Sequence, residues 1–236
     1  MHRFENLQKE IDNCSLPSTR KERASFQHLS VTQKLFSVEY YKEELISFET
    51  ARFIDAASQS STTSSGTPAQ LPQQLPVGLQ LHFQLNRIID GFVTNAKSVF
   101  DTLARELQWL YEGTPQGDIY FHAWPPSGLP QRYSASLLWG NIDAVKEEKW
   151  YTYLNLLRSS TIHESLISTR INLEFDPITN TIPISHIYLS DDPKVWPMTY
   201  ARQSDLKRFT EQTHQNITKF LEEIATITKN DLPNIS

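Results

Sequence analysis

One segment of helical periodicity, 79-LQLHFQLNRIIDGFVTNAKSVFDTLARELQWLYEG-113, constrains the fold of this chain more than any other feature. Within it, apolar residues recur at steps of three and four, at Leu85, Ile88, Phe92, Ala96, Val99, Leu103, Leu107 and Leu110. Gly113 and Pro115 give the stop signal, and Gly91 is a position where the helix can bend. At about 1.5 Å per residue this helix is roughly 50 Å long, so it must be the spine of the domain.

Three further helices, each with an apolar face, are expected around this spine. Segment 31–57 has Ser30 as its expected N-cap and a helical stripe at Leu35, Val38, Tyr41, Leu45 and Phe48. A helix is expected to start at Asn141 or Asp143 and to run to residue 167, with an inward stripe at Trp150, Leu154, Leu157 and Thr161. The last helix is expected over 204–229, with Leu206, Phe209, Ile217, Phe220, Ile224 and Ile227 inward.

One β-hairpin is predicted over residues 170–190. That segment switches to β-branched and aromatic residues around a turn at Asp176-Pro177 and Asn180. Pro183 lacks a backbone N–H and therefore marks the second strand as an edge strand. The predicted fold class is mainly α: an up-and-down helical bundle with one small inserted β-hairpin.

The expected domain organisation is one bundle with appendages. Residues 1–29 are polar and mixed, which predicts an N-terminal arm that is either a short helix or mobile. The bundle is expected over 30–229, and 230–236 form a tail. Inside the bundle, residues 58–76 are rich in Ser, Thr, Gln and Pro and carry no charge, so we expect a flexible loop there.

Composition excludes several classes of protein. The formal net charge of -5 argues against a protein that coats nucleic acid non-specifically, although it leaves room for a local basic site. Cys14 is the only cysteine, so no intrachain disulfide can form and a reducing compartment is expected. No apolar run approaches the roughly 20 residues that a membrane span needs, and the first residues are too polar for a signal peptide. We therefore expect a cytoplasmic protein with no membrane partner.

An arginine followed four to six residues later by a histidine occurs three times, as Arg23 to His28, Arg158 to His163, and Arg208 to His214. The first falls in the poorly patterned N-terminal region, and the third spans about 600° of helix, so both are expected to be solvated surface charges. The middle pair differs because it lies about 140° apart on one helix and flanks a small, polar stretch.

The long helix with 95-NAKSVFDTLARELQW-109, followed by the helix with 154-LNLLRSSTIHES-165, resembles the HEPN superfamily of prokaryotic helical-bundle proteins. The hallmark of that superfamily is arginine, four to six residues, then histidine, and the resemblance covers roughly residues 30–228. Active members usually have Asn, Asp or His after the arginine, whereas this chain has Ser159.

The resemblance implies a homodimeric, metal-independent endoribonuclease of a toxin-antitoxin or phage defence system. His163 would exchange protons with the ribose 2'-OH and the leaving 5'-oxygen, and Arg158 would hold the phosphate. Ser159 and Glu164 would orient these two catalytic residues. RNA and an antitoxin or other protein are the partners it implies, and no cofactor is expected.

Two alternatives stay open at this point. Because of Ser159, the chain can instead be a catalytically inactive HEPN-like module that binds RNA or protein. In a purely structural protein, Arg158 pairs with Glu164 or Glu148. The histidines show no metal-ligand spacing, so no metal site is expected. The aromatic residues of loop 119–133 are expected to pack that loop onto the bundle rather than to stack on bases.

Overall fold

The computed structural model describes residues 2–48, 77–113, 117, 119–126, 128–164, 167, 169–176, 181–194 and 198–235. Within these ranges, the side chains of residues 2, 77–81, 162–164, 171–176 and 181–185 are not described. The expected flexible loop 58–76 lies outside the described residues, as does the end of the helix predicted over 31–57.

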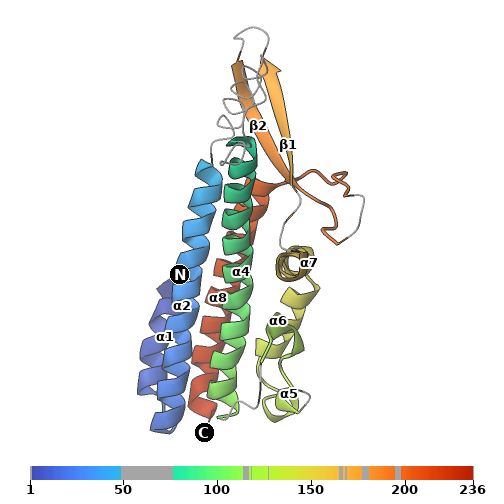
Figure 1. Ribbon diagram of the computed structural model, residues 1–236. Coiled ribbons are helices and arrows are strands. Elements are labelled where there is room, and N and C mark those ends of the chain that lie inside the picture. The colour runs from blue at the N-terminus through green and yellow to red at the C-terminus, as the bar shows by residue number, and fades with distance from the viewer. Residues whose placement is uncertain are drawn as a thin grey trace, which may run out of the picture.

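Three long helices run along the axis of the molecule: α2 (Ser18–Ser47), α4 (Val77–Tyr111) and α8 (Leu206–Asp231). The shorter α1 (His2–Asn13) lies beside α2 and α8. Figure 1 shows α2 flanked by α1 and α4, with α8 behind them. The mainly α architecture predicted from the sequence is confirmed, and α4 covers the predicted spine almost residue for residue.

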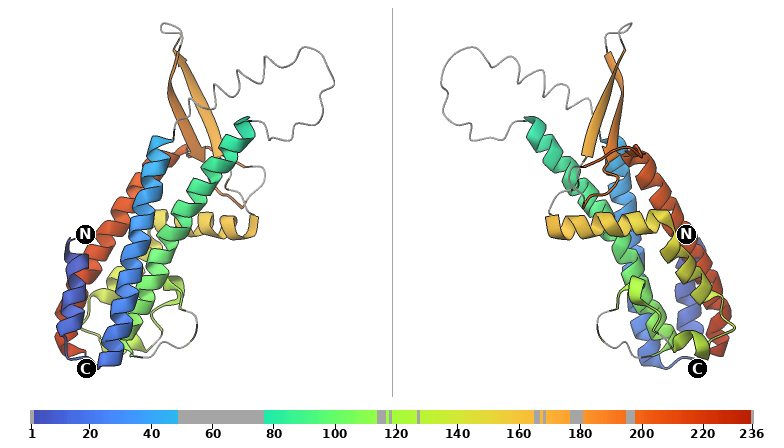
Figure 2. Two further views of the ribbon diagram at one scale, coloured as in Figure 1. Left: turned by 60° about the vertical axis from the view of Figure 1, so that its left-hand side comes forward. Right: turned by 90° about the vertical axis from the view of Figure 1, so that its right-hand side faces the viewer.

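The connection from α4 to α8 passes along the opposite side of α4 from α2 (Figure 2). It contains the 3-10 helix η1 (Phe121–Ala123) and the α-helices α5 (Leu129–Arg132), α6 (Leu138–Glu147) and α7 (Lys149–Glu164). The single helix predicted from Asn141 or Asp143 to residue 167 is therefore wrong, since the helix begins at Leu138 and breaks at Glu148. The backbone of Glu148 is extended, and α7 lies across the bundle axis.

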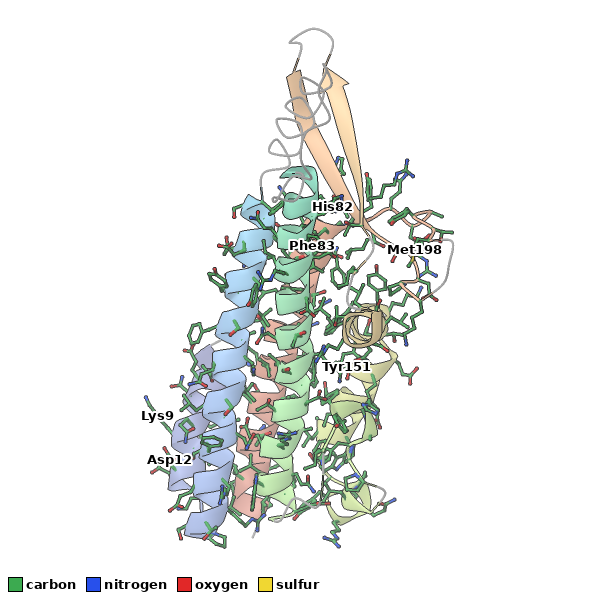
Figure 3. All side chains as sticks on the ribbon, in the orientation of Figure 1. Lys9, Asp12, His82, Phe83, Tyr151 and Met198 are labelled. Atoms are coloured by element: carbon green, nitrogen blue, oxygen red, sulfur yellow. The ribbon has the colours of Figure 1, made fainter. Side chains whose placement is uncertain are left out.

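Packing explains that break, because α7 can then place aromatic rings against the middle of the spine. Phe100 of α4 lies at the centre of a cluster of rings that α7, α8 and the η1 loop supply, namely Phe121, Trp150, Tyr151 and Phe220. The hydroxyl of Tyr151, seen where α7 meets α4 in Figure 3, accepts a hydrogen bond from Lys97 Nζ at 2.9 Å. Burial of this cluster supplies the main attachment of α7 to the bundle.

The predicted hairpin is present as β1 (Thr169–Asp176) and β2 (Thr181–Leu189), which pair antiparallel. A third strand, β3 (Ser204–Asp205), pairs with Tyr188 and Leu189 in the order β1-β2-β3. The prediction that β2 is an edge strand therefore holds only in part. Its last residues, Tyr188 and Leu189, lie between β1 and β3, whereas position 183 lies outside the short pairing with β3.

The N-terminal residues include the short helix that was one of the two expectations for them, and both ends of the chain pack more closely than an arm and a tail would. Residues 2–29 form α1 and the first turns of α2, and α1 buries Phe4, Leu7 and Ile11 completely or nearly so. At the other end, α8 continues to Asp231 and is followed by η2 (Leu232–Asn234). Ser30 does not cap α2, because its hydroxyl donates to the Phe26 carbonyl at 2.9 Å inside the helix.

Three contacts set the register between α2 and α4. At one end, the Arg20 guanidinium donates to the Trp109 and Leu110 carbonyls at 3.2 and 2.6 Å, where α4 ends before Gly113, a residue with φ 83°. In the middle, His28 meets Glu106. Towards the other end, the Tyr41 ring lies directly on Gly91, where any side chain would collide with it.

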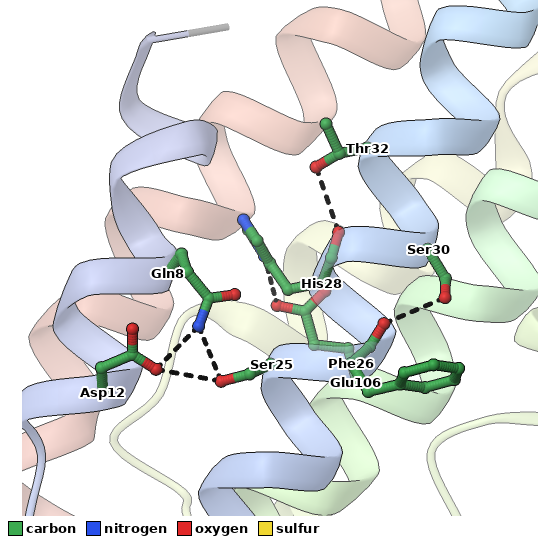
Figure 4. A network of polar contacts seen from close by, with 8 residues as sticks. All are labelled: Gln8, Asp12, Ser25, Phe26, His28, Ser30, Thr32 and Glu106. Carbon is green, nitrogen blue, oxygen red and sulfur yellow. Dashed lines mark hydrogen bonds and ion pairs between the residues drawn. The ribbon is translucent and has the colours of Figure 1, made fainter.

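The middle contact is a buried ion pair (Figure 4). His28 is only 3% exposed and Glu106 is fully buried, and His28 Nδ1 donates to Glu106 Oε1 at 2.9 Å. The imidazole also stacks on Phe4 of α1, with 4.4 Å between ring centroids. Burial alone lowers the pKa of His28, but the facing Glu106 carboxylate outweighs burial and raises that pKa above its ordinary value of 6.5.

This pair predicts a specific dependence of stability on pH. A folded-state pKa above the unfolded value contributes stability that is complete below about pH 6.5 and is lost as the pH rises through the folded-state pKa. Glu106→Gln should therefore lower the free energy of unfolding by about 3 kcal/mol at low pH, and by only about 1 kcal/mol above that pKa. Urea denaturation between about pH 5.5 and 9 measures both values. The exposed Glu211→Gln on α8 is the control, and a loss that stays constant with pH would contradict the assignment.

The contact between Tyr41 and Gly91 predicts non-additive substitutions. A Cβ on Gly91 would lie 2.4 to 2.8 Å from atoms of the Tyr41 ring, so Gly91→Ala should gain nothing in the wild type. In a Tyr41→Ala background the same substitution should stabilise the protein by about 1 kcal/mol, the usual helix preference of alanine over glycine. A double-mutant cycle measured by chemical denaturation tests this, and equal effects of Gly91→Ala in the two backgrounds would refute it.

Candidate functional site

Arg158, the predicted phosphate binder, is half-buried in the second half of α7. Its Nη1 donates to the Thr161 hydroxyl at 3.2 Å, and that hydroxyl donates to the Arg158 carbonyl at 2.9 Å. Ser159 beside it is also half-buried, and Ser160 is buried. The guanidinium is therefore held against its own helix by a neutral hydroxyl.

For the other two predicted site residues, His163 and Glu164, the structure describes only the backbone. His163 and Glu164 belong to α7, but their side chains lie outside the described residues, so the pairing of Arg158 with His163 stays a prediction. Glu148, one of the two structural partners proposed for Arg158, is exposed at the break before α7. Among the described side chains, no carboxylate lies within ion-pair distance of Arg158. The structure thus leaves the positive charge of Arg158 without a described partner.

The other two arginine–histidine spacings are not the pairs of solvated charges that the sequence predicts. His28 is buried against Glu106 and Phe4, while Arg23 is exposed. His214 is half-buried and pairs with Glu39 of α2, so it ties α8 to α2. Sequence reasoning missed both roles because each acidic partner lies far away along the chain.

A histidine–aspartate pair on the sheet was also missed. His186 of β2 holds Asp205 of β3 through Nδ1 at 3.0 Å, and its ring stacks on Tyr188. The second oxygen of Asp205 accepts the Arg208 backbone N–H at 3.0 Å and caps α8. The Asp205 contact orients the ring through Nδ1, and Nε2 has no hydrogen-bond partner among the described residues. The only sequence signal was the alternation of His186 and Tyr188 on one strand.

The aromatic loop packs as predicted. Phe121 and Trp124 are buried, and Trp124 lies edge-on to Trp139 of α6. Lys146 Nζ donates to the Trp124 carbonyl at 2.5 Å, which fixes the loop to α6. Tyr120 remains about half exposed and stacks on the exposed His122, with 5.7 Å between ring centroids, while the larger rings of the loop are packed inward.

A cleft of about 670 Å³ lies between the end of α2 and the start of α4. Its lining includes Tyr41, Glu44, Arg87 and Asp90, so charges of both signs face it. Arg158 lines neither this cleft nor four smaller pockets of the described residues. The predicted phosphate binder is therefore not part of these five pockets.

The most distinctive surface is on α2. Its outward face carries Phe26, Leu29, Gln33, Phe36 and Tyr40, hereafter the outward strip, at the steps of three and four that place residues on one side of a helix. The four apolar members are 62%, 55%, 65% and 59% exposed, in that order. The inward face of α2 is apolar as well, with Ala24, Val31, Leu35, Val38 and Leu45 buried. This helix is thus hydrophobic on two opposite sides and is covered on one.

The described residues contain no group of three or more histidine, cysteine, aspartate or glutamate side chains arranged to hold a metal ion. Within the same ranges, no helix has both the length and the apolar character of a membrane span. Comparison with known proteins finds no matching family model, no matching curated protein and no matching solved structure.

Proposed function

We propose that the protein is a helical binding module that recognises an amphipathic helix of a protein partner through the outward strip of α2. The observation that carries this proposal is the size and continuity of the strip. It holds four of the seven large hydrophobic side chains that are most exposed in the described part of the chain. Extended exposed apolar surface on a folded domain is typical of interaction sites.

The shape and chemistry of the strip support a helix as the ligand. The strip is roughly 20 Å long, and its residues follow the a and d spacing of a coiled-coil helix. The a and d side chains of a docked helix would therefore pack between them. The residues along its edge are small: the hydroxyls of Ser30 and Ser37 donate to carbonyls of their own helix, at 2.9 and 3.1 Å. Small, internally satisfied side chains let a partner helix approach without leaving polar groups unpaired.

The proposal predicts binding of a suitable helical probe. A designed, fluorescently labelled peptide with leucine at heptad positions a and d should bind the full chain, as measured by fluorescence anisotropy. Leu29→Glu or Phe36→Glu should weaken its binding at least tenfold, because each puts a charge in the centre of the strip.

Leu137→Glu is the matched control, since Leu137 is 73% exposed but lies away from α2. Equal affinity of the wild type and the two strip variants would refute the proposal.

A second function is favoured by Arg158, whose charge has no acidic partner among the described side chains. Its one described side-chain contact is with a neutral hydroxyl, which leaves the other guanidinium donors without a described partner and suited to an anion. This supports the metal-independent ribonuclease that the HEPN resemblance implies, with Arg158 holding the phosphate and His163 exchanging protons. Cleavage would form the bond between O2' and phosphorus, break the bond to O5', and leave a 2',3'-cyclic phosphate.

This ribonuclease hypothesis has a direct test. His163→Ala and Arg158→Lys should each abolish cleavage of labelled RNA and keep the helical circular dichroism spectrum, because an ammonium cannot reproduce the guanidinium fork. A chelator should not change the rate. Arg208→Lys, an exposed arginine on α8, is the control. A purified wild-type protein that leaves RNA intact, or His163→Ala protein that cleaves as fast as wild type, would eliminate this function.

A further inference from the structure

The outward strip of α2 has nearly the same pattern when it is read in either direction. Its residues are Phe26, Leu29, Gln33, Phe36 and Tyr40, with Gln33 at the centre and an aromatic ring at each end. Glu22 and Glu43 continue the same spacing and are exposed, so charge closes the apolar strip at both ends. A two-fold axis through the middle of the strip would place an antiparallel second copy against it in register.

We infer that the occupant of this strip is the α2 helix of a second copy of this chain, packed antiparallel about an axis near Gln33. This inference rests on the proposed binding role of the strip and names its partner. In such a pair, Leu29 packs between Gln33 and Tyr40 of the other copy, and Phe36 packs between Phe26 and Gln33 of the other copy. Every contact occurs twice, as an isologous interface requires.

The charged residues beside the strip favour the antiparallel orientation of the two α2 helices. In an antiparallel pair, the edge position of Arg23 faces that of Glu44 of the other copy, and Ser30 faces Ser37. Arg23 and Glu44 are both exposed, and neither side chain has an ion-pair partner among the described residues. A parallel pair would instead bring Arg23 opposite Ser18 and Glu44 opposite Glu39 of the other copy. That arrangement therefore loses the pairing of Arg23 with Glu44 and replaces it with a contact between two carboxylates, which disfavours it.

The buried area sets the expected strength. A fully buried aromatic side chain covers roughly 150–250 Å², so two copies of this partly exposed strip bury on the order of 1,000 Å² in total. Specific interfaces start at about 1,200 Å², and those near this limit are weak. We therefore expect reversible dimers with a dissociation constant in the micromolar range.

Pairing through α2 also determines where Arg158 lies in the assembly. The motif helix α7 lies beyond α4 from α2, so the two α7 helices of such a dimer are far from the two-fold axis (Figures 1 and 2). The arrangement differs from a cleft shared by two motif helices, which the resemblance implies. Any chemistry at Arg158 would then take place within one copy.

Sedimentation velocity of the full chain, from about 1 to 200 µM, tests the inference over the range expected for a weak interface. The wild type should shift from monomer to dimer, Leu29→Glu and Phe36→Glu should stay monomeric, and Leu137→Glu should behave as wild type. Arg23→Glu and Glu44→Arg should each weaken the dimer several-fold, and the double variant should restore it, because the reversed charges again face each other across the axis.

Three results would overturn the inference. They are a wild type that stays monomeric at every concentration, a dimer that Leu29→Glu and Phe36→Glu leave intact, and a double charge variant no stronger than the single ones. The experiments distinguish failure of the dimer from failure of the proposed binding function. If the wild type is monomeric but the designed peptide still binds in a strip-dependent way, the strip binds a helix of another protein and only the second copy is excluded.

Discussion

The antiparallel packing of α2 on α4 is the constraint on which the rest of the fold depends. Arg20, His28 and Tyr41 meet α4 at three successive levels, so sliding one helix along the other would break all three contacts at once. The central contact also holds α1, because Phe4 stacks on the His28 imidazole. The other face of α4 then receives α7 and the aromatic loop around Phe100. The two faces of α4 thus connect the α1–α2 side of the molecule to the α7 side.

The sequence predicts those parts of the fold whose signal is local. The α4 helix, the hairpin and α8 follow from spacing, from turn residues and from caps that lie within a few positions of each other. The start of α2 and the break at Glu148 do not. Ser30 looks like a cap but bonds inside the helix, since α2 is extended by packing of its first turns on α1. No glycine or proline marks Glu148, where the chain bends to bring its rings onto Phe100.

The same distinction applies to the candidate sites. Arg158 was found through spacing within one helix, whereas the roles of His28, His186 and His214 depend on carboxylates from distant segments. Periodicity in a single sequence contains no information about such partners. The outward strip was accessible in principle, because its residues have helical spacing too. One apolar face is enough to place α2 in a bundle, however, so helical spacing alone does not assign a role to the second face.

Comparison of α2 with α8 shows why that second face matters. Both are long helices of the same bundle, and both bury one apolar side. The exposed positions of α8 are polar or charged throughout, among them Lys207, Glu211, Gln215, Lys219 and Glu223. If the outer face of α2 served only to contact water, its exposed positions would be polar or charged as they are on α8. Large side chains that stay in water contribute nothing to folding and favour association, so their concentration on one helix is best explained by a surface that is covered when the protein acts.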